Sequence, residues 1–232
     1  GVTPSRCVRS RTHTDHTQHS QGAHRFHAPG QEAVTVGQSG PAGSGTTLTI
    51  APIVISNGIP IITPSATSPA LSSLDDNDLV WRTVTSDAFQ GIFLAEKLIE
   101  DEQQTASVIF RNDAYGSGLQ QAFTNRFQEL GGQILSSISY PEEKSDNFTS
   151  QVNELFAQGD PDALVVISFV IDGANIMVAL ANSGISPMPQ LYGVDGNNRS
   201  EFLENSPSQI VLGMRGSSPT APSTSPNYIS FR

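Results

Sequence analysis

The strongest constraint on the fold is an alternation, from residue 59 onward, between short apolar segments and longer amphipathic segments. The short segments are rich in Ile, Val and Leu and predict buried strands, as in ALVVIS at 163–168. The longer segments carry apolar residues every three or four positions, which predicts helices that each bury one face. Strands that alternate with helices form βαβ units, so the sequence predicts an α/β fold with parallel sheets covered on both faces.

The expected elements have definite limits. Asp87 is expected in the first turn of one helix, where the helix dipole favours a carboxylate. Gly131 and Gly132 are expected to end another helix. Strands are predicted at 59–63, 106–110, 133–140, 163–168 and 190–194, and the apolar run 210–214 completes the series. Helices are predicted at 86–103, 118–130, 148–158, 173–183 and 199–205.

Charge and cysteine content exclude several classes of partner and site. The formal net charge is −10, which makes nucleic acid and anionic membrane surfaces poor partners. The single cysteine, Cys7, allows no intrachain disulfide and no thiolate metal site. No apolar run reaches the roughly 18 residues of a membrane span, and the start of the chain lacks the apolar region of a signal peptide.

The first 40 residues differ from the rest. They contain all five histidines and few large apolar residues, without a helical or strand period. Such a segment cannot bury enough surface to order itself, so residues 1–40 are expected to be disordered or not native sequence. His13, His16 and His19 recur at intervals of three and offer a second interpretation, a metal-binding tract, although no carboxylate or cysteine completes a site.

The stretch GPAGSGTT, residues 40–47, raises the question of a phosphate-binding P-loop. Gly40 and Gly45 have the spacing of that motif, and AVTV at 33–36 is a candidate for the preceding strand. However, Thr46 stands where the motif requires the lysine that neutralises the phosphates. The residues by themselves therefore argue against a P-loop.

Ligands of open α/β sheets bind outside the carboxyl ends of the strands, which selects the loops 64–69, 111–118, 169–173 and 195–198. The hydroxyls and amides of the first loop can accept a carboxylate or phosphate, or can act as an ordinary helix cap. Tyr115 can face a ligand or pack on the next helix, and Asp195 can hold an ammonium group or form an Asp-Gly turn. Asp172 is a helix cap or a ligand contact.

Taken together, these loops suit the capture of a zwitterion better than catalysis. A carboxylate would meet the Ser/Thr loop, and an ammonium group would meet Asp195. The histidines all lie in the N-terminal segment, so no base for a catalytic triad is in reach. We therefore expect neither an enzyme nor a cofactor.

Several of these motifs, in order, resemble one family of proteins. IPIITPSATSPALSSL, VWRTVTSDAFQGIFLAEKL, VIFRNDAYGSGLQQAFTNRFQELGG, DALVVISFVIDGANIMVALANSG and QLYGVDGNN are similar to the solute-binding proteins of branched-chain amino-acid ABC transporters. The resemblance covers about residues 44 to 222. It implies a type I periplasmic binding fold, in which two α/β lobes close on a ligand, and it implies that GSGTT is a ligand loop rather than a P-loop.

The resemblance also implies roles for particular residues. Ser44 and Thr67, with the backbone at Ser65 and Ala66, would hold the ligand carboxylate, and Asp195 would take the ammonium group. Tyr115 and Phe169 would cover the ligand from the second lobe. Phe169 stands where many relatives have Tyr, and Asp195 stands where Glu is common.

The implied organisation is an N-terminal segment 1–40, part of a first lobe at 41–104, a second lobe at 105–214, and a truncated return to the first lobe at 215–232. The first lobe is therefore expected to be incomplete. The implied function is periplasmic capture of an amino acid or similar small polar solute for delivery to an ABC transporter permease. The alternative is a ligand-sensing domain of a regulator or receptor with the same fold.

Overall fold

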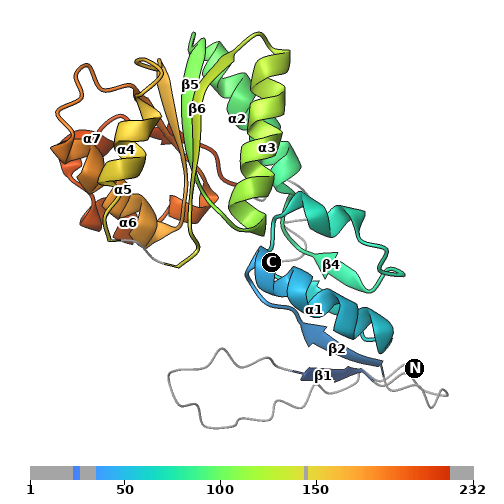
Figure 1. Ribbon diagram of the computed structural model, residues 1–232. Helices are drawn as coiled ribbons and strands as arrows, with labels where there is room; N and C mark the ends of the chain where they lie inside the picture. The colour runs from blue at the N-terminus through green and yellow to red at the C-terminus, as the bar shows by residue number, and fades with distance from the viewer. Residues whose placement is uncertain (1–22, 27–34, 144–145, 220–232) are drawn as a thin grey trace, which may run out of the picture.

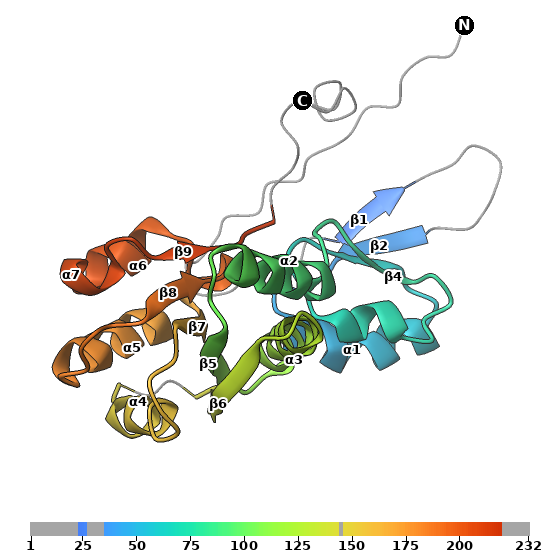
Figure 2. The same ribbon diagram turned by 90° about the horizontal axis from the view of Figure 1, so that it is seen from above.

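The protein forms two separate β-sheets with helices packed against them (Figures 1 and 2). A computed structural model describes residues 23–26, 35–143 and 146–219. The first sheet contains β1 (Ala23–Phe26), β2 (Thr35–Ser39), β3 (Ile61–Thr63) and β4 (Val80–Arg82). The second contains β5 (Thr105–Arg111), β6 (Gln133–Tyr140), β7 (Ala163–Ile167), β8 (Gln190–Gly193) and β9 (Arg215–Gly216). The predicted α/β class is confirmed.

Seven α-helices and two short 3-10 helices connect these strands within the described residues. The α-helices are α1 (Ser44–Ser56), α2 (Asp87–Glu100), α3 (Ala114–Glu129), α4 (Thr149–Leu155), α5 (Val170–Asn182), α6 (Ser200–Asn205) and α7 (Ser208–Val211). The 3-10 helices are η1 (Pro69–Ser73) and η2 (Asp195–Asn197). None of the helices in the described part is long and apolar enough to cross a membrane.

The second sheet is parallel throughout, with the strand order β6-β5-β7-β8-β9. After β5 the chain adds β6 on one side, and after β6 it returns to add β7 on the other side. The order therefore reverses between β5 and β7, and ligands of doubly wound sheets bind outside the strand ends at such a point. The strands at this point end at Arg111 and Ile167.

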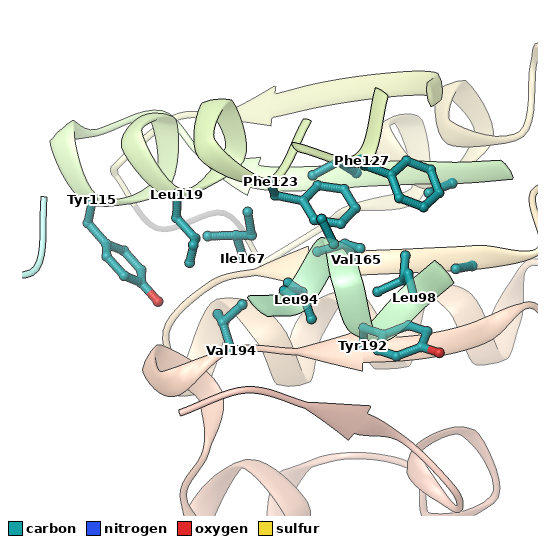
Figure 3. Close-up of a cluster of buried hydrophobic side chains, with 14 residues drawn as sticks. Leu94, Leu98, Tyr115, Leu119, Phe123, Phe127, Val165, Ile167, Tyr192 and Val194 are labelled. Carbon is teal, nitrogen blue, oxygen red and sulfur yellow. The ribbon is translucent and has the colours of Figure 1, made fainter. Parts of the chain in front are cut away.

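Both faces of this sheet are buried. On one face, Val108 and Val165 pack with α2 and α3, whose Leu94 and Phe123 belong to the same cluster (Figure 3). On the other face, Ile109 belongs to a second cluster formed with α4, α5 and α6. Successive strand residues point to opposite faces, so a strand buried on both sides must be apolar throughout. This requirement explains the continuous apolar runs in the sequence.

Helix α2 belongs to the core of the second lobe, in the cluster that also contains Phe123 of α3. Figure 1 shows α2 and α3 side by side along the same face of the sheet, and Leu94 and Leu98 of α2 are fully buried there. The predicted limit after residue 104 had assigned this helix to the first lobe. The chain instead passes from the first sheet to the second lobe between β4 and α2.

The first lobe differs most from expectation. Helix α1 was not predicted, because its sequence TTLTIAPIVIS is rich in β-branched residues and contains Pro52, both of which disfavour a helix. Its buried positions nevertheless recur at helical spacing, at Ser44, Thr47, Ala51 and Val54. The periodicity was missed because it is carried by small and polar residues rather than by large apolar ones.

Three further differences concern element limits. Helix α3 begins at Ala114 rather than at 118, because the Asp113 side chain accepts a hydrogen bond from the Gly116 N–H and caps the helix. The predicted strand 210–214 is wrong, since the chain forms α7 and then the two-residue strand β9. Strands β1 and β2 lie within residues 1–40, where the only expected element was the candidate strand 33–36, which overlaps β2; most of that segment, including four of its five histidines, lies outside the described residues.

Candidate functional site

A cleft of about 650 Å³ lies where residues of the first sheet's loops meet the carboxyl ends of the second sheet. The first lobe contributes Ala42, Gly43, Ser44, Ser65 and Thr67. The second lobe contributes side chains from the ends of β5, β6, β7 and β8 and from the starts of the following helices. Its position is the one that the strand order predicts for a ligand site.

The wall from the first lobe is a surface of hydrogen-bond donors. Helix α1 begins at Ser44, and its first intrahelical bond runs from the Thr47 N–H to the Gly43 carbonyl. The amides before Thr47 therefore have no acceptor within the helix, and they lie at the positive end of the helix dipole. The Ser44 hydroxyl accepts a hydrogen bond of 3.1 Å from the Ser68 N–H, which joins the helix start to the loop 64–68. This wall is suited to a carboxylate or another anion.

Two side chains fix the shape of the loop 64–68. The Thr63 hydroxyl donates to the Pro41 carbonyl at 2.6 Å and accepts from the Ala66 N–H at 3.1 Å. Arg82, at the end of β4, donates to the Thr67 carbonyl at 3.1 Å and to the Ser68 carbonyl at 2.9 Å. Because the carbonyls turn toward Arg82, the loop conformation is held by groups outside the cleft.

The opposite wall presents a carboxylate. Asp195 is the first residue of η2, and its Oδ1 accepts a 2.8 Å hydrogen bond from the Tyr115 hydroxyl. The same hydroxyl accepts from the Gly196 N–H at 3.2 Å. Within the described residues, no lysine or arginine forms an ion pair with Asp195. Asp195 is therefore a cleft carboxylate without a cationic partner in the part of the chain that the structure describes.

Asn197 holds this turn in place. Its side-chain amide donates to the Val166 carbonyl at 2.9 Å and to the Ser168 hydroxyl at 3.0 Å, while its oxygen accepts from the Val194 N–H at 2.9 Å. These bonds attach the segment after β8 to the end of β7. They position Asp195 opposite Tyr115.

Tyr115 lies in the first turn of α3 rather than on a loop. Its ring is buried and stacks on Phe169, with ring centroids 5.2 Å apart and planes inclined by 13°. Burial raises the pKa of Tyr115 well above its usual value, and the Asp195 carboxylate adds to this effect. Tyr115 therefore stays neutral and acts as a donor to Asp195. Phe169 is 42% exposed and presents its ring to the cleft.

Sequence reasoning missed Arg111, the last residue of β5. Its guanidinium pairs with Asp113 at 2.8 Å, with Asp172 at 2.9 Å and with Glu142 at 3.2 Å, and it lies 5.1 Å from the Phe169 ring centroid. Because its guanidinium is paired with three carboxylates of the protein, Arg111 is not a free cation for a ligand. The only signal in the sequence was the polar segment RND, residues 111–113, directly after the predicted strand 106–110.

Six of the seven predicted site residues line the cleft: Ser44, Ser65, Thr67, Tyr115, Phe169 and Asp195. Ala66 does not, because it is fully buried and its amide donates to Thr63. The stretch GPAGSGTT joins β2 to α1, and Thr46 still occupies the lysine position of a P-loop. In the part of the chain that the structure describes, no cluster of His, Cys, Asp or Glu is arranged to hold a metal ion.

The chain matches a known protein family. The family described as "Receptor family ligand binding region" matches residues 4–188. This range includes most of the segment 1–40, whose expected disorder or non-native origin stays a prediction.

Comparison with individual proteins gives two kinds of relative. An uncharacterized protein of Methanocaldococcus jannaschii is 28% identical over 180 residues, which cover 74% of this chain and 43% of that protein. Metabotropic glutamate receptor 4 of Mus musculus is 27% identical over 135 residues, which cover 57% of this chain and 15% of the receptor. The chain thus spans less than half the length of these relatives.

Among solved structures, the leucine-binding protein LivK of Thermotoga maritima aligns with a TM-score of 0.72 and 26% sequence identity. The alignment covers 83% of this chain and 54% of that protein. The parallel sheets, the flanking helices and this likeness together confirm the expected type I periplasmic binding fold.

Proposed function

Because this chain belongs to the family of receptor ligand-binding regions, we propose that it captures an amino acid or a similar small polar solute between its two lobes. In this proposal it delivers the solute to the membrane permease of an ABC transporter. The family and the likeness to a leucine-binding protein support solute binding, and they favour binding over catalysis.

The observation that carries the proposal is the polarity of the cleft. One wall offers the amides at the start of α1 and the hydroxyls of Ser44 and Thr67. The other wall offers Asp195, oriented by Tyr115 and without a cationic partner among the described residues. A carboxylate would bind the first wall and an ammonium group the second, through charge-assisted hydrogen bonds. An α-amino acid carries both groups.

The same cleft supports a proposal for the solute class. Phe169 and Ile171 are large apolar side chains that stay half exposed beside the polar groups. A solute with an apolar side chain would cover them, which agrees with the LivK likeness and favours a branched-chain amino acid. A periplasmic location, as expected from the resemblance, completes the proposal.

Calorimetric titration with L-leucine, L-valine, L-glutamate and glycine tests the proposal. A ligand that binds only the folded protein should also stabilise it by ~2.7 kcal/mol at about one hundred times its Kd, which a melting experiment detects. Asp195→Asn keeps the shape of the side chain and removes its charge. We expect it to weaken binding by ~2–5 kcal/mol, because the ligand ammonium would lose its partner.

The matched control is Asp160→Asn, an exposed carboxylate at the amino end of β7, away from the cleft. It should leave binding unchanged. Equal loss of affinity in both variants would refute the assignment of Asp195. Conversion of the solute into another compound during incubation would refute a binding protein and indicate an enzyme.

The alternative is a ligand-sensing domain, which the similarity to a metabotropic glutamate receptor supports. Both functions use the same cleft and differ in what responds to its closure. Deletion of the gene separates them. Loss of uptake of the labelled solute indicates transport, whereas loss of a signalling response with normal uptake indicates a sensor.

A further inference from the structure

A carboxyl group outside the cleft, that of Asp87, lies where the chain passes between the two lobes. Asp87 is the first residue of α2, and its N–H donates to the Thr67 carbonyl at 2.9 Å. One turn later, the Gln90 side-chain amide donates to the carbonyl and hydroxyl of Ser217, at 3.1 and 3.2 Å, in the segment after β9. The first turn of α2 is thus attached to the ligand loop of the first lobe and to a distant part of the chain.

The Asp87 side chain is fully buried, and neither of its oxygens has a hydrogen-bond partner among the described residues. The Gln90 side-chain oxygen is also buried without a hydrogen-bond partner in the described part of the chain. Buried polar atoms are nearly always paired, and an unpaired buried charge is far more costly than an unpaired neutral group. Burial without hydrogen-bond partners therefore favours the neutral, protonated form of Asp87. The dipole of α2, from which an ionised carboxylate was expected, does not outweigh this burial.

The charged groups around Asp87 come from three other elements. Burial raises its pKa to about 7; the Thr67 hydroxyl lowers the pKa, although it makes no hydrogen bond of regular geometry. Asp195 in η2 and Asp113 at the start of α3 raise the pKa, while Arg82 in β4 lowers it. Asp87 also acts on Tyr115, the residue that bonds Asp195. Asp87 is therefore in electrostatic contact with the carboxylate wall of the cleft.

We propose that Asp87 releases a proton to solvent when the cleft captures a cationic amino group at Asp195. The proposal rests on the proposed function, because it places an ammonium group beside Asp195. A positive charge there favours the ionised form of a neighbouring acid. The Asp87 O–H bond breaks, its proton passes to the buffer, and the carboxylate remains as a second counter-charge for the ligand.

Linkage fixes the direction of the effect. If ligand binding drives a proton off the protein, then raising the pH tightens ligand binding by the same coupling. The Kd should fall as the pH rises toward neutrality and become constant above it, because free Asp87 is then already ionised. Couplings between sites are typically 5- to 150-fold, so we expect a change of roughly tenfold between about pH 5.5 and about pH 8.

The test is calorimetric titration with L-leucine at several pH values, in pairs of buffers with different ionisation enthalpies. The ammonium and carboxylate groups of L-leucine keep their charges over this range, so the ligand contributes no proton. With a pKa of about 7 in the free protein and a tenfold coupling, we expect the wild-type protein to release at most about half a proton per ligand, at about pH 6.5. Asp87→Asn resembles the protonated acid, so its Kd should stay near the wild-type acidic value at every pH, with no proton released.

Glu96→Gln is the matched control, because Glu96 lies on the same helix and is exposed, paired with Arg126. This variant should keep the wild-type pH dependence. Binding of L-leucine with a constant Kd and no proton release would overturn the linkage and leave the proposed function intact. The linkage would also be overturned, and the proposed function left intact, if the Kd of Asp87→Asn for L-leucine kept the pH dependence of the wild type. If Asp87→Asn does not fold, the proton count of the wild-type protein decides alone.

Failure of the proposed function has a different signature. No binding of L-leucine, L-valine, L-glutamate or glycine at any pH, by a protein that unfolds cooperatively, would refute solute capture and the linkage with it.

Discussion

Replacing Asp87 by Asn should make the free protein more stable at alkaline pH and leave it almost unchanged at acidic pH. Asp87 is fully buried with no hydrogen-bond partner for its oxygens in the described chain. Burial is the main reason that its pKa is raised to about 7. Asn has nearly the same shape as the protonated acid and cannot ionise. The variant therefore removes only the cost of charging this site.

The sign and size follow from proton linkage. An exposed Asp in the unfolded chain has a pKa of about 3.9, so between roughly pH 4 and pH 7 the folded state holds a proton that the unfolded state has released. Stability contributed by the raised pKa is complete below about pH 4 and is lost as the pH rises through about 7. A difference of about three pKa units corresponds to about 4 kcal/mol in the free energy of unfolding. Asp87→Asn should gain most of this amount at about pH 8.

Urea unfolding followed by far-ultraviolet circular dichroism measures the effect. The informative quantity is the difference between variant and wild type at about pH 5 and at about pH 8, since the other titrating groups are shared and cancel. We expect this difference to change by about 3 kcal/mol in favour of the variant, because about two of the three pKa units lie between pH 5 and pH 7. A difference that is independent of pH, or a variant that is less stable at pH 8, would refute the assignment of a buried neutral acid.

Three further predictions use the same methods. Phe123→Ala, in the fully buried cluster under α2 and α3, should lower the free energy of unfolding by ~3–5 kcal/mol, and a loss below about 1 kcal/mol would contradict that packing. Gly196→Ala would place a methyl group 2.5 Å from the Ser168 carbonyl oxygen, so η2 must shift and L-leucine titration should show weaker binding; unchanged affinity would argue against this close approach. Lys97 holds the pKa of Asp101 below its usual range, so Asp101→Asn should destabilise the protein at neutral pH, with an effect that decreases as the pH falls from about 4 through the lowered pKa. Equal destabilisation in urea unfolding at neutral pH and at about pH 2 would exclude the ion pair as its cause.

The sequence was sufficient to predict strands β5 to β8 and the existence of the helices between them, because their signals are local. Strands buried on both faces must be apolar throughout, and a helix packed on them must repeat its apolar residues at helical spacing. Phe123 and Phe127 on α3, or Val165 and Val166 on β7, meet these conditions within a short window of sequence. Because ligands of such sheets bind at the carboxyl ends of the strands, the positions of the strands along the chain were enough to select the loops that carry Tyr115 and Asp195.

The same kind of reasoning failed where the local signal was weak or misleading. Helix α1 buries Ser44, Thr47, Ala51 and Val54, a helical repeat without large side chains, in a sequence whose β-branched residues and proline favour other conformations. Its start at the cleft therefore became visible only in the structure. Tyr115 was expected on a loop because the cap supplied by Asp113 was not recognised.

What the sequence determined by itself was the α/β class, the apolar strands and the strand ends where a ligand would bind, because each depends on neighbours along the chain. The tertiary structure decided which charges are paired. Arg111 meets Asp172 across 61 residues, and Tyr115 meets Asp195 across 80 residues. It also decided that Asp87 is buried while Asp195 faces the cleft without a cationic partner in the described chain. Burial and pairing depend on segments that are distant in sequence. The sequence around an aspartate at a helix start is therefore the same whether its side chain is exposed to water or buried in the protein interior.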